Sequence, residues 1–124
     1  MQVLIVDNSL LIIHRLEELL SETANISRMY RAAFYKEALE LFMLNKPDIV
    51  VLDIGLPQNA SYQLLKEIKK ANPETVVIIL SIHIDEYTQQ QCSILGADFF
   101  FDKYHEYEKI SEVINFFHNK KLVS

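Results

Sequence analysis

The chain has 124 residues, of which half are hydrophobic and 23% are charged, and this is the composition of a globular domain. Its formal net charge of −5 argues against a nucleic-acid-binding surface, because such surfaces need clustered positive charge. A single cysteine excludes an internal disulfide bond, and no apolar stretch approaches the roughly 18 residues of a membrane span. We therefore expect one domain, residues 1–124, in a reducing cytoplasm without direct nucleic-acid or membrane contact.

Short apolar segments along the chain predict strands. Most of them are continuous and rich in β-branched or aromatic residues, which is typical of strands that are buried on both faces of a sheet. The clear segments are residues 3–6, 49–52, 76–80 and 99–101. A weaker candidate at residues 26–33 is interrupted by Arg28 and Arg31.

Segments with helical periodicity separate these strands. Ser9 is a suitable N-cap for the first helix, two prolines end the second and third helices, and Gly96 ends the fourth. The later helices are expected at residues 36–45, 61–71, 86–95 and 106–119. Alternation of strands and helices predicts an α/β fold, namely a doubly wound, five-stranded parallel sheet that is covered by helices on both faces.

Polar residues follow four of the predicted strands, at the edge where open parallel sheets bind their ligands. These residues are Asp7 and Asn8, Asp53, Ser81 and Lys103, in chain order. Each one alone fits a helix cap, a turn or a solvated surface, but together they predict one site. Carboxylate oxygens suit a hard cation such as Mg²⁺, and a lysine with a hydroxyl suits phosphoryl oxygens.

Glycine-rich nucleotide loops are missing from the sequence. Neither Gly-x-x-x-x-Gly-Lys nor Gly-x-Gly-x-x-Gly occurs, and Gly55 and Gly96 are the only glycines. Gly55 lies two residues after Asp53, where a backbone carbonyl could face a cation. A phosphoryl group that is held by a metal ion and a lysine therefore fits better than a bound nucleotide.

Four segments of the sequence, VLIVDNS, PDIVVLDIGLP, VVIILS and LGADFFFDK, match a known family in order and spacing. With them the chain resembles the receiver domain of bacterial two-component response regulators over essentially its whole length. The resemblance implies the flavodoxin-like (βα)5 receiver fold. It also implies a phosphorelay switch that uses Mg²⁺ as cofactor. Such a switch is not an enzyme, and its only implied reactions are Mg-assisted self-phosphorylation and self-dephosphorylation. A sensor histidine kinase or a phosphotransfer protein would donate the phosphoryl group to Asp53.

The resemblance also implies a role for each matching residue. The implied metal positions are Asp7, Asn8, Asp53 and the carbonyl of Gly55. The implied phosphoryl-contacting and switch positions are Ser81, Lys103 and Phe100. Family members read out the switch on the face that is built here by residues 86–95, 99–101 and 106–119. An output partner is therefore expected on that face, where Tyr104 and Tyr107 are candidate contacts. A homodimer is a further expected assembly.

Several positions depart from the family pattern. Asn8 replaces a second acid, which should weaken Mg²⁺ binding by roughly tenfold, and Ile82 replaces a small residue and is expected to crowd the approach to Asp53. Tyr104 replaces a proline after Lys103, and the loop after Pro57 lacks its usual glycine. These departures favour an alternative, a pseudo-receiver that binds partners without phosphorylation. A small flavodoxin-like enzyme or nucleotide binder is a third alternative, which the missing glycine loops oppose.

Two further side chains have simpler interpretations. Cys92 lies in a polar stretch, so we expect an inert or exposed thiol rather than a redox site. His83 lies two residues after Ser81 and is expected to be a solvated loop histidine. The sequence leaves open the cognate kinase, the output beyond Ser124 and the oligomeric state.

Overall fold

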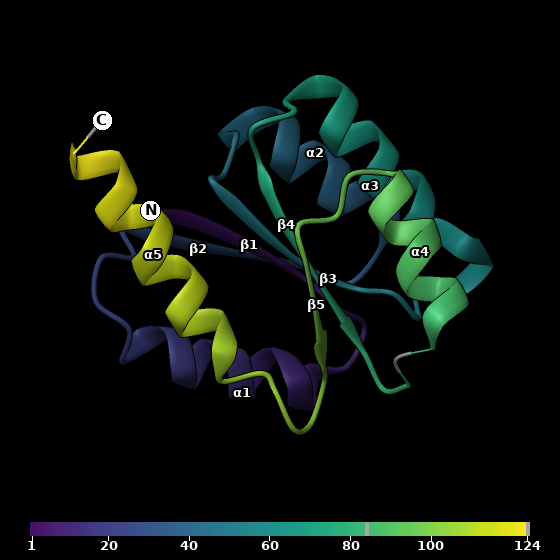
Figure 1. The fold of residues 1–124 in the computed structure, drawn as a ribbon, viewed down its shortest axis with the longest axis horizontal. Helices are drawn as coiled ribbons and strands as arrows, with labels where there is room; N and C mark the ends of the chain where they lie inside the picture. The colour runs from purple at the N-terminus through teal and green to yellow at the C-terminus, as the bar shows by residue number, and fades with distance from the viewer. Residues whose placement is uncertain (84, 124) are drawn as a thin grey trace.

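The structure, a computed structural model, describes residues 1–83 and 85–123 as a parallel sheet between two layers of helices (Figure 1). The strands are β1 (Gln2–Val6), β2 (Arg28–Ala32), β3 (Ile49–Asp53), β4 (Val76–Ser81) and β5 (Phe99–Asp102). The helices are α1 (Leu10–Ser21), α2 (Tyr35–Asn45), α3 (Ala60–Ala71), α4 (Glu86–Ile94) and α5 (Lys109–Val123), with a short turn, η1 (Pro57–Asn59), before α3. The predicted doubly wound α/β fold is confirmed. Within the part of the chain that is described, no helix combines the length and hydropathy of a membrane span.

The sheet has the strand order β2-β1-β3-β4-β5, and all of its strand pairs are parallel. Val6 pairs with Leu52, so Asp7 and Asp53 follow equivalent positions of two central strands. Ser81 pairs with Asp102, which places Lys103 immediately beyond the end of β4. The register therefore gathers the polar residues that follow β1, β3, β4 and β5 at one edge.

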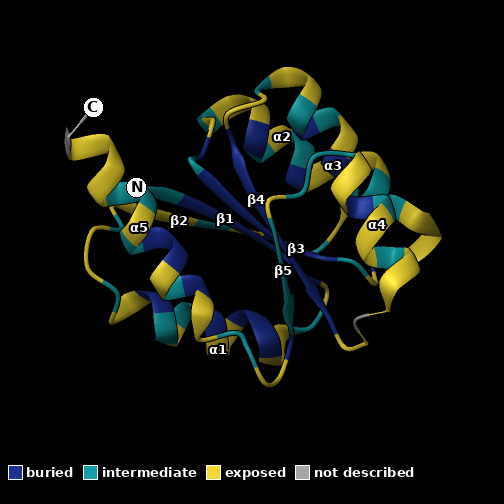
Figure 2. Cartoon of the chain, viewed as in Figure 1, coloured by how far each residue is buried: buried dark blue, intermediate teal, exposed yellow. Residues whose placement is uncertain are grey.

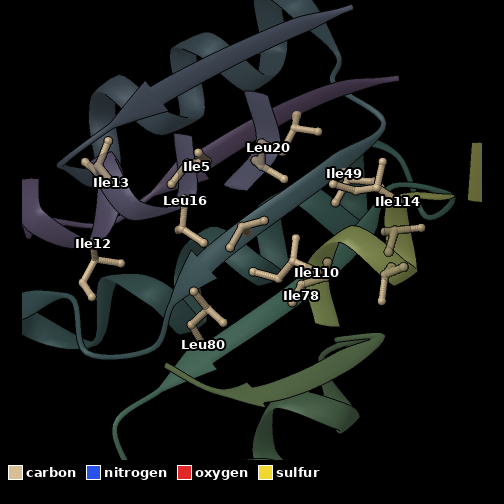
Figure 3. Close-up of a cluster of buried hydrophobic side chains, with 14 residues drawn as sticks. Ile5, Ile12, Ile13, Leu16, Leu20, Ile49, Ile78, Leu80, Ile110 and Ile114 are labelled. Carbon is tan, nitrogen blue, oxygen red and sulfur yellow. The ribbon is translucent and has the colours of Figure 1, made fainter. Parts of the chain in front are cut away.

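Two hydrophobic clusters hold the layers together. One cluster packs α1 and α5 on one face of the sheet, and its members include Ile5, Leu16, Ile78 and Ile114 (Figure 3). The other cluster packs α2, α3 and the single buried residue of α4 on the opposite face. β3 and β4 are buried along their whole lengths (Figure 2), which explains their continuous apolar sequences. β2 lies at the sheet edge, where the interrupting arginines are exposed.

Most predicted helix ends agree with the structure. The Ser9 hydroxyl accepts a hydrogen bond from the Ile12 N–H at 3.4 Å, so the predicted N-cap of α1 is confirmed. Gly96 follows α4 with a φ of 103°, a left-handed conformation that glycine adopts at low cost. Helix α5 begins at Lys109, later than expected. The reason is a turn in which the Asp102 carboxylate accepts hydrogen bonds from the backbone N–H groups of Tyr104 and His105.

Cys92 is fully buried. The thiol is therefore not exposed, and the expectation of an inert thiol is the one that agrees with the structure. Its neighbours in α4 are polar because the rest of this helix faces solvent, and Cys92 is the only buried residue within Glu86–Ile94. Burial raises the pKa of its thiol to about 11. The thiol is therefore protonated and shielded at neutral pH.

Candidate functional site

Two carboxylates and one ammonium group meet at the carboxyl edge of the sheet. The Lys103 Nζ lies 2.7 Å from Asp7 Oδ2 and 3.3 Å from Asp53 Oδ2. All three residues are buried, with exposed fractions of 1% for Asp7, 5% for Asp53 and 6% for Lys103. The three residues come from the ends of β1, β3 and β5, so the tertiary fold brings together what the sequence placed at separate strand ends.

Burial and pairing act in opposite directions on these groups. Burial raises the pKa of Asp7, although Lys103 and the Ser9 N–H, which donates to Asp7 Oδ1 at 2.8 Å, partly oppose the increase. For Lys103, burial favours the neutral amine, but contacts with Asp7 and Asp53 outweigh it and raise the pKa. Lys103 therefore stays charged. Two aspartates and one lysine have formal charges that sum to −1, which suits a bound cation.

The loop after β3 is fixed around Asp53. The Gly55 N–H donates to Asp53 Oδ1 at 3.0 Å, and the buried Ser61 hydroxyl donates to the Asp53 carbonyl oxygen at 2.5 Å. Ser61 also accepts a hydrogen bond from the Leu56 N–H at 3.3 Å. Sequence reasoning missed this role of Ser61, because a serine at the start of a helix has no distinguishing signal. The expected carbonyl contact of Gly55 with a cation stays a prediction.

The loop after Pro57 contains two non-glycine residues with positive φ. Gln58 and Asn59 have φ values of 60° and 58°, the left-handed region that favours glycine. Asparagine tolerates this region well, whereas glutamine does so at a higher cost. Two residues other than glycine therefore adopt a backbone conformation that favours glycine, in the loop that leads into α3.

Ser81 is the last residue of β4 and is buried, with 4% of its surface exposed. Its hydroxyl donates to the His83 carbonyl oxygen at 2.5 Å, and its own carbonyl accepts a hydrogen bond from the Lys103 N–H at 2.9 Å. The side chain of His83 is exposed as expected, so its backbone is the part that contacts Ser81. Phe100 is half-buried on β5 and packs against the cluster beneath α2, α3 and α4.

The remaining candidate residues lie nearer the surface. Asn8 is exposed, Ile82 is 56% exposed and Tyr104 is 47% exposed. The exposure of Ile82 lends no support to the expectation that it crowds Asp53. Tyr107 is half-buried against the cluster of α1 and α5, so ordinary packing accounts for it.

The donor set fits a hard cation. Asp7 Oδ2 is a buried oxygen that lies 2.7 Å from the Lys103 ammonium, and the same ammonium lies 3.3 Å from Asp53 Oδ2. Within residues 1–83 and 85–123, no group of three or more His, Cys, Asp and Glu forms a metal site. Mg²⁺ needs only one or two protein carboxylates and completes its shell with water and substrate oxygens. The two aspartates are therefore sufficient as protein anions for Mg²⁺.

Comparisons with known sequences agree with this geometry. The model of the response regulator receiver domain family matches residues 3–115. Sensory transduction protein LytT of Bacillus anthracis is 30% identical over 122 residues, which are 98% of this chain and 48% of that protein. Transcriptional regulatory protein LytR of Staphylococcus aureus is 27% identical over 115 residues, 93% of this chain and 46% of that protein. The chain thus spans about half the length of these curated relatives.

Solved structures show the same architecture. A response regulator receiver domain protein from Clostridium thermocellum has a TM-score of 0.85 and 28% identity, over 99% of this chain and 98% of that chain. The receiver domain of a Francisella response regulator has a TM-score of 0.84 and 27% identity, over 97% of this chain and 98% of that chain. The predicted flavodoxin-like receiver fold is therefore confirmed.

Proposed function

Because the chain belongs to the response regulator receiver domain family, we propose that Asp53 accepts a phosphoryl group from a sensor histidine kinase or a phosphotransfer protein. One geometric relationship supports this role above the others: the Lys103 ammonium contacts both Asp53 and Asp7 in a buried site. The ammonium stands where negative charge would accumulate when Asp53 is phosphorylated. Charge-assisted pairing of this kind is stronger than pairing between neutral groups.

The proposed transfer is a substitution at phosphorus. A carboxylate oxygen of Asp53 attacks the phosphoryl group, an O–P bond forms, and the N–P bond of the phosphohistidine breaks with its electron pair left on the imidazole. Lys103 holds the acceptor carboxylate and neutralises part of the charge on the phosphoryl oxygens. Mg²⁺, held by Asp7, Asp53 and nearby backbone or amide oxygens, would supply further charge neutralisation at the phosphoryl group. Attack of water on the phosphorus of the product would break the O–P bond, release inorganic phosphate and return the free Asp53 carboxylate.

Phosphorylation would then change the surroundings of Ser81. The phosphoryl group adds acceptor oxygens beside Lys103, and a hydrogen bond to a charged group contributes roughly 1.5–3 kcal/mol. The hydroxyl of Ser81 would leave the His83 carbonyl to donate to the phosphoryl group, and Phe100 would repack beside it. We propose that an output partner or a second copy of the chain reads this change on the face of α4, β5 and α5. We expect a switch that is controlled by a histidine kinase to act in the cytoplasm.

The direct test is intact-mass spectrometry after incubation with acetyl phosphate, with and without Mg²⁺. We expect a gain of about 80 Da, the mass of one added phosphoryl group, in the presence of Mg²⁺, and no gain for Asp53→Asn. Asp98→Asn is the matched control, because Asp98 is an exposed acid that pairs with Lys69 away from the site. A mass gain that persists in Asp53→Asn would contradict the assignment of the acceptor.

One observation favours the pseudo-receiver alternative. Asn8 is exposed and carries no charge, so Asp7 and Asp53 are the only anions of the described site, and Lys103 already contacts both. A chain that gains no mass from either acetyl phosphate or a phosphorylated kinase, yet binds an output partner, would establish the alternative.

A further inference from the structure

A pocket lies at the edge of the sheet opposite to the Asp53 site, where the strands begin. It has a volume of about 570 Å³ and lies between the loop before β3, the loop before β4 and the last turns of α5. Pockets that hold one small molecule typically enclose roughly 300–1,000 Å³, so the size suits a single organic ligand. The walls combine apolar side chains, including Val76 and Phe117, with charged groups.

Thr75 provides an unused polar group in this wall. Only 2% of its surface is exposed, and its hydroxyl has no hydrogen-bond partner among the described residues. Its backbone is already satisfied, because its N–H donates to the Asn72 carbonyl at 3.1 Å and its carbonyl accepts from Lys69 Nζ at 2.6 Å. A buried hydroxyl without a partner is unfavourable, so a ligand oxygen that pairs with it would be stabilised.

The charged side chains that line the pocket have a positive net charge. Asp48 is already engaged, since its Oδ1 lies 2.6 Å from Lys121 Nζ and its Oδ2 accepts the Gln2 N–H at 2.7 Å. Lys46 and Lys120 line the pocket without a carboxylate partner among residues 1–83 and 85–123. Glu74 is the one lining carboxylate that lacks an ion pair in that part of the chain. Lys46 is the C-cap of α2 and Lys120 lies in the last turn of α5, so the partial negative charge of each helix C-terminus offsets part of the lysine charge.

We propose that this pocket binds a small organic carboxylate with an apolar body. The carboxylate lies between the Lys46 and Lys120 ammonium groups and within reach of the Thr75 hydroxyl, and the apolar body packs on Phe117 and Val76. The site lies at the end of the sheet away from Asp53, so the proposal does not rest on phosphorylation. It assigns the chain a ligand-binding function in addition to that of the carboxyl edge.

Benzoate is a suitable probe, with benzyl alcohol and benzylammonium as neutral and cationic controls of similar shape. In ¹⁵N-resolved NMR titrations we expect benzoate to shift the amide signals of Thr75, Val76 and Phe117, with a Kd on the order of 1 mM. The signals of Asp53 and Gly55 should stay unchanged. Benzyl alcohol should bind at least about fivefold more weakly, because it cannot form the ion pairs. Equal binding of benzoate and benzyl alcohol, or benzoate shifts that avoid these three residues, would overturn the proposal.

Variants then test the named groups. Lys46→Gln combined with Lys120→Gln should weaken benzoate binding by about tenfold, and Thr75→Val should weaken it by about fivefold, without lowering the thermal stability. The matched control is Lys36→Gln combined with Lys66→Gln, because both residues are exposed lysines outside the pocket lining. If the control pair weakens binding as much as the pocket pair, the attraction comes from overall charge and the assigned site is wrong.

Discussion

The hydroxyl of Ser81 donates to the carbonyl oxygen of His83 at 2.5 Å, so the proposed switch hydroxyl already has a partner in its own loop. A phosphoryl group on Asp53 would have to compete with that carbonyl for the same hydrogen. The charge-assisted hydrogen bond to the phosphoryl group is stronger than the bond to the carbonyl by only a few kcal/mol. The chain without phosphate should therefore already populate the switched form to a small extent.

Beryllofluoride, as a stand-in for the phosphoryl group on Asp53, should therefore shift the NMR signals of Phe100 and of the backbone around His83. In Ser81→Ala the analogue should still bind, but the Phe100 shift should shrink because the hydroxyl no longer couples the two sites. Ser93→Ala, at an exposed position of α4, should leave the shift intact. Identical Phe100 signals in free and beryllofluoride-bound protein would exclude the coupling.

Asn8→Asp should increase the affinity for Mg²⁺ by about tenfold, or ~1.4 kcal/mol, because it adds a charge next to the Asp7 and Asp53 carboxylates. Titration calorimetry with MgCl₂ measures the effect. Asn119→Asp is a control with the same change of net charge at an exposed position near the end of α5, which lies at the opposite edge of the sheet. Unchanged or weaker binding in Asn8→Asp would show that Asn8 does not limit the affinity.

The raised pKa of Asp7 predicts a pH-dependent stability. Burial is its main cause, and a carboxyl whose folded pKa lies above the unfolded value binds protons more tightly when folded. The contribution of Asp7 to the stability of the folded state therefore decreases as the pH rises from the unfolded pKa to the folded pKa. Above the folded pKa, the loss of stability remains at its full size. Asp7→Asn, measured by urea unfolding without Mg²⁺, should be more stable relative to wild type at about pH 7 than at about pH 4. Glu40→Gln, at an exposed acid of α2, should show a nearly flat difference, and a flat difference for Asp7→Asn would contradict the expectation.

Gln58→Gly should stabilise the fold by up to about 1 kcal/mol, because glycine adopts a φ of 60° without the cost that a β-carbon imposes. The greater entropy of glycine in the unfolded chain offsets part of the gain. Asn59→Gly provides the comparison, since asparagine tolerates a φ of 58° better and its replacement should help less. Thermal unfolding of the two variants checks the order, and a larger gain for Asn59→Gly would reverse it.

Cys92 should react slowly with Ellman's reagent at about pH 8. A pKa of about 11 leaves only a small thiolate fraction, roughly a hundredfold below that of an ordinary thiol, and burial adds steric protection. In urea the reaction should become fast. The variant Cys92→Ser with Ser93→Cys moves the thiol one position to an exposed site and should react quickly while folded. Equal rates for the two folded proteins would mean that α4 opens often enough to expose Cys92.

The sequence alone determines the architecture. Continuous apolar segments predict buried strands, helical periodicity between them predicts crossovers, and the predicted strands agree with the structure to within a residue or two. Arg28 and Arg31 already mark β2 as the weak segment, which is the exposed edge strand. The start of α5 is less predictable, because the turn that delays it depends on side-chain hydrogen bonds of Asp102.

The position of Asp7, Asp53, Ser81 and Lys103 at one edge of the sheet also follows from the sequence, because residues that end neighbouring parallel strands must meet there. Tertiary structure decides how those residues are paired. The Lys103 ammonium contacts Asp7 more closely than Asp53, the Ser61 hydroxyl fixes the loop at Asp53, and Ser81 donates to the His83 carbonyl. Exposure of Ile82 and burial of Cys92 are likewise outcomes of three-dimensional packing. Local patterns specify which element a residue belongs to, whereas partners and burial depend on segments that are distant along the chain.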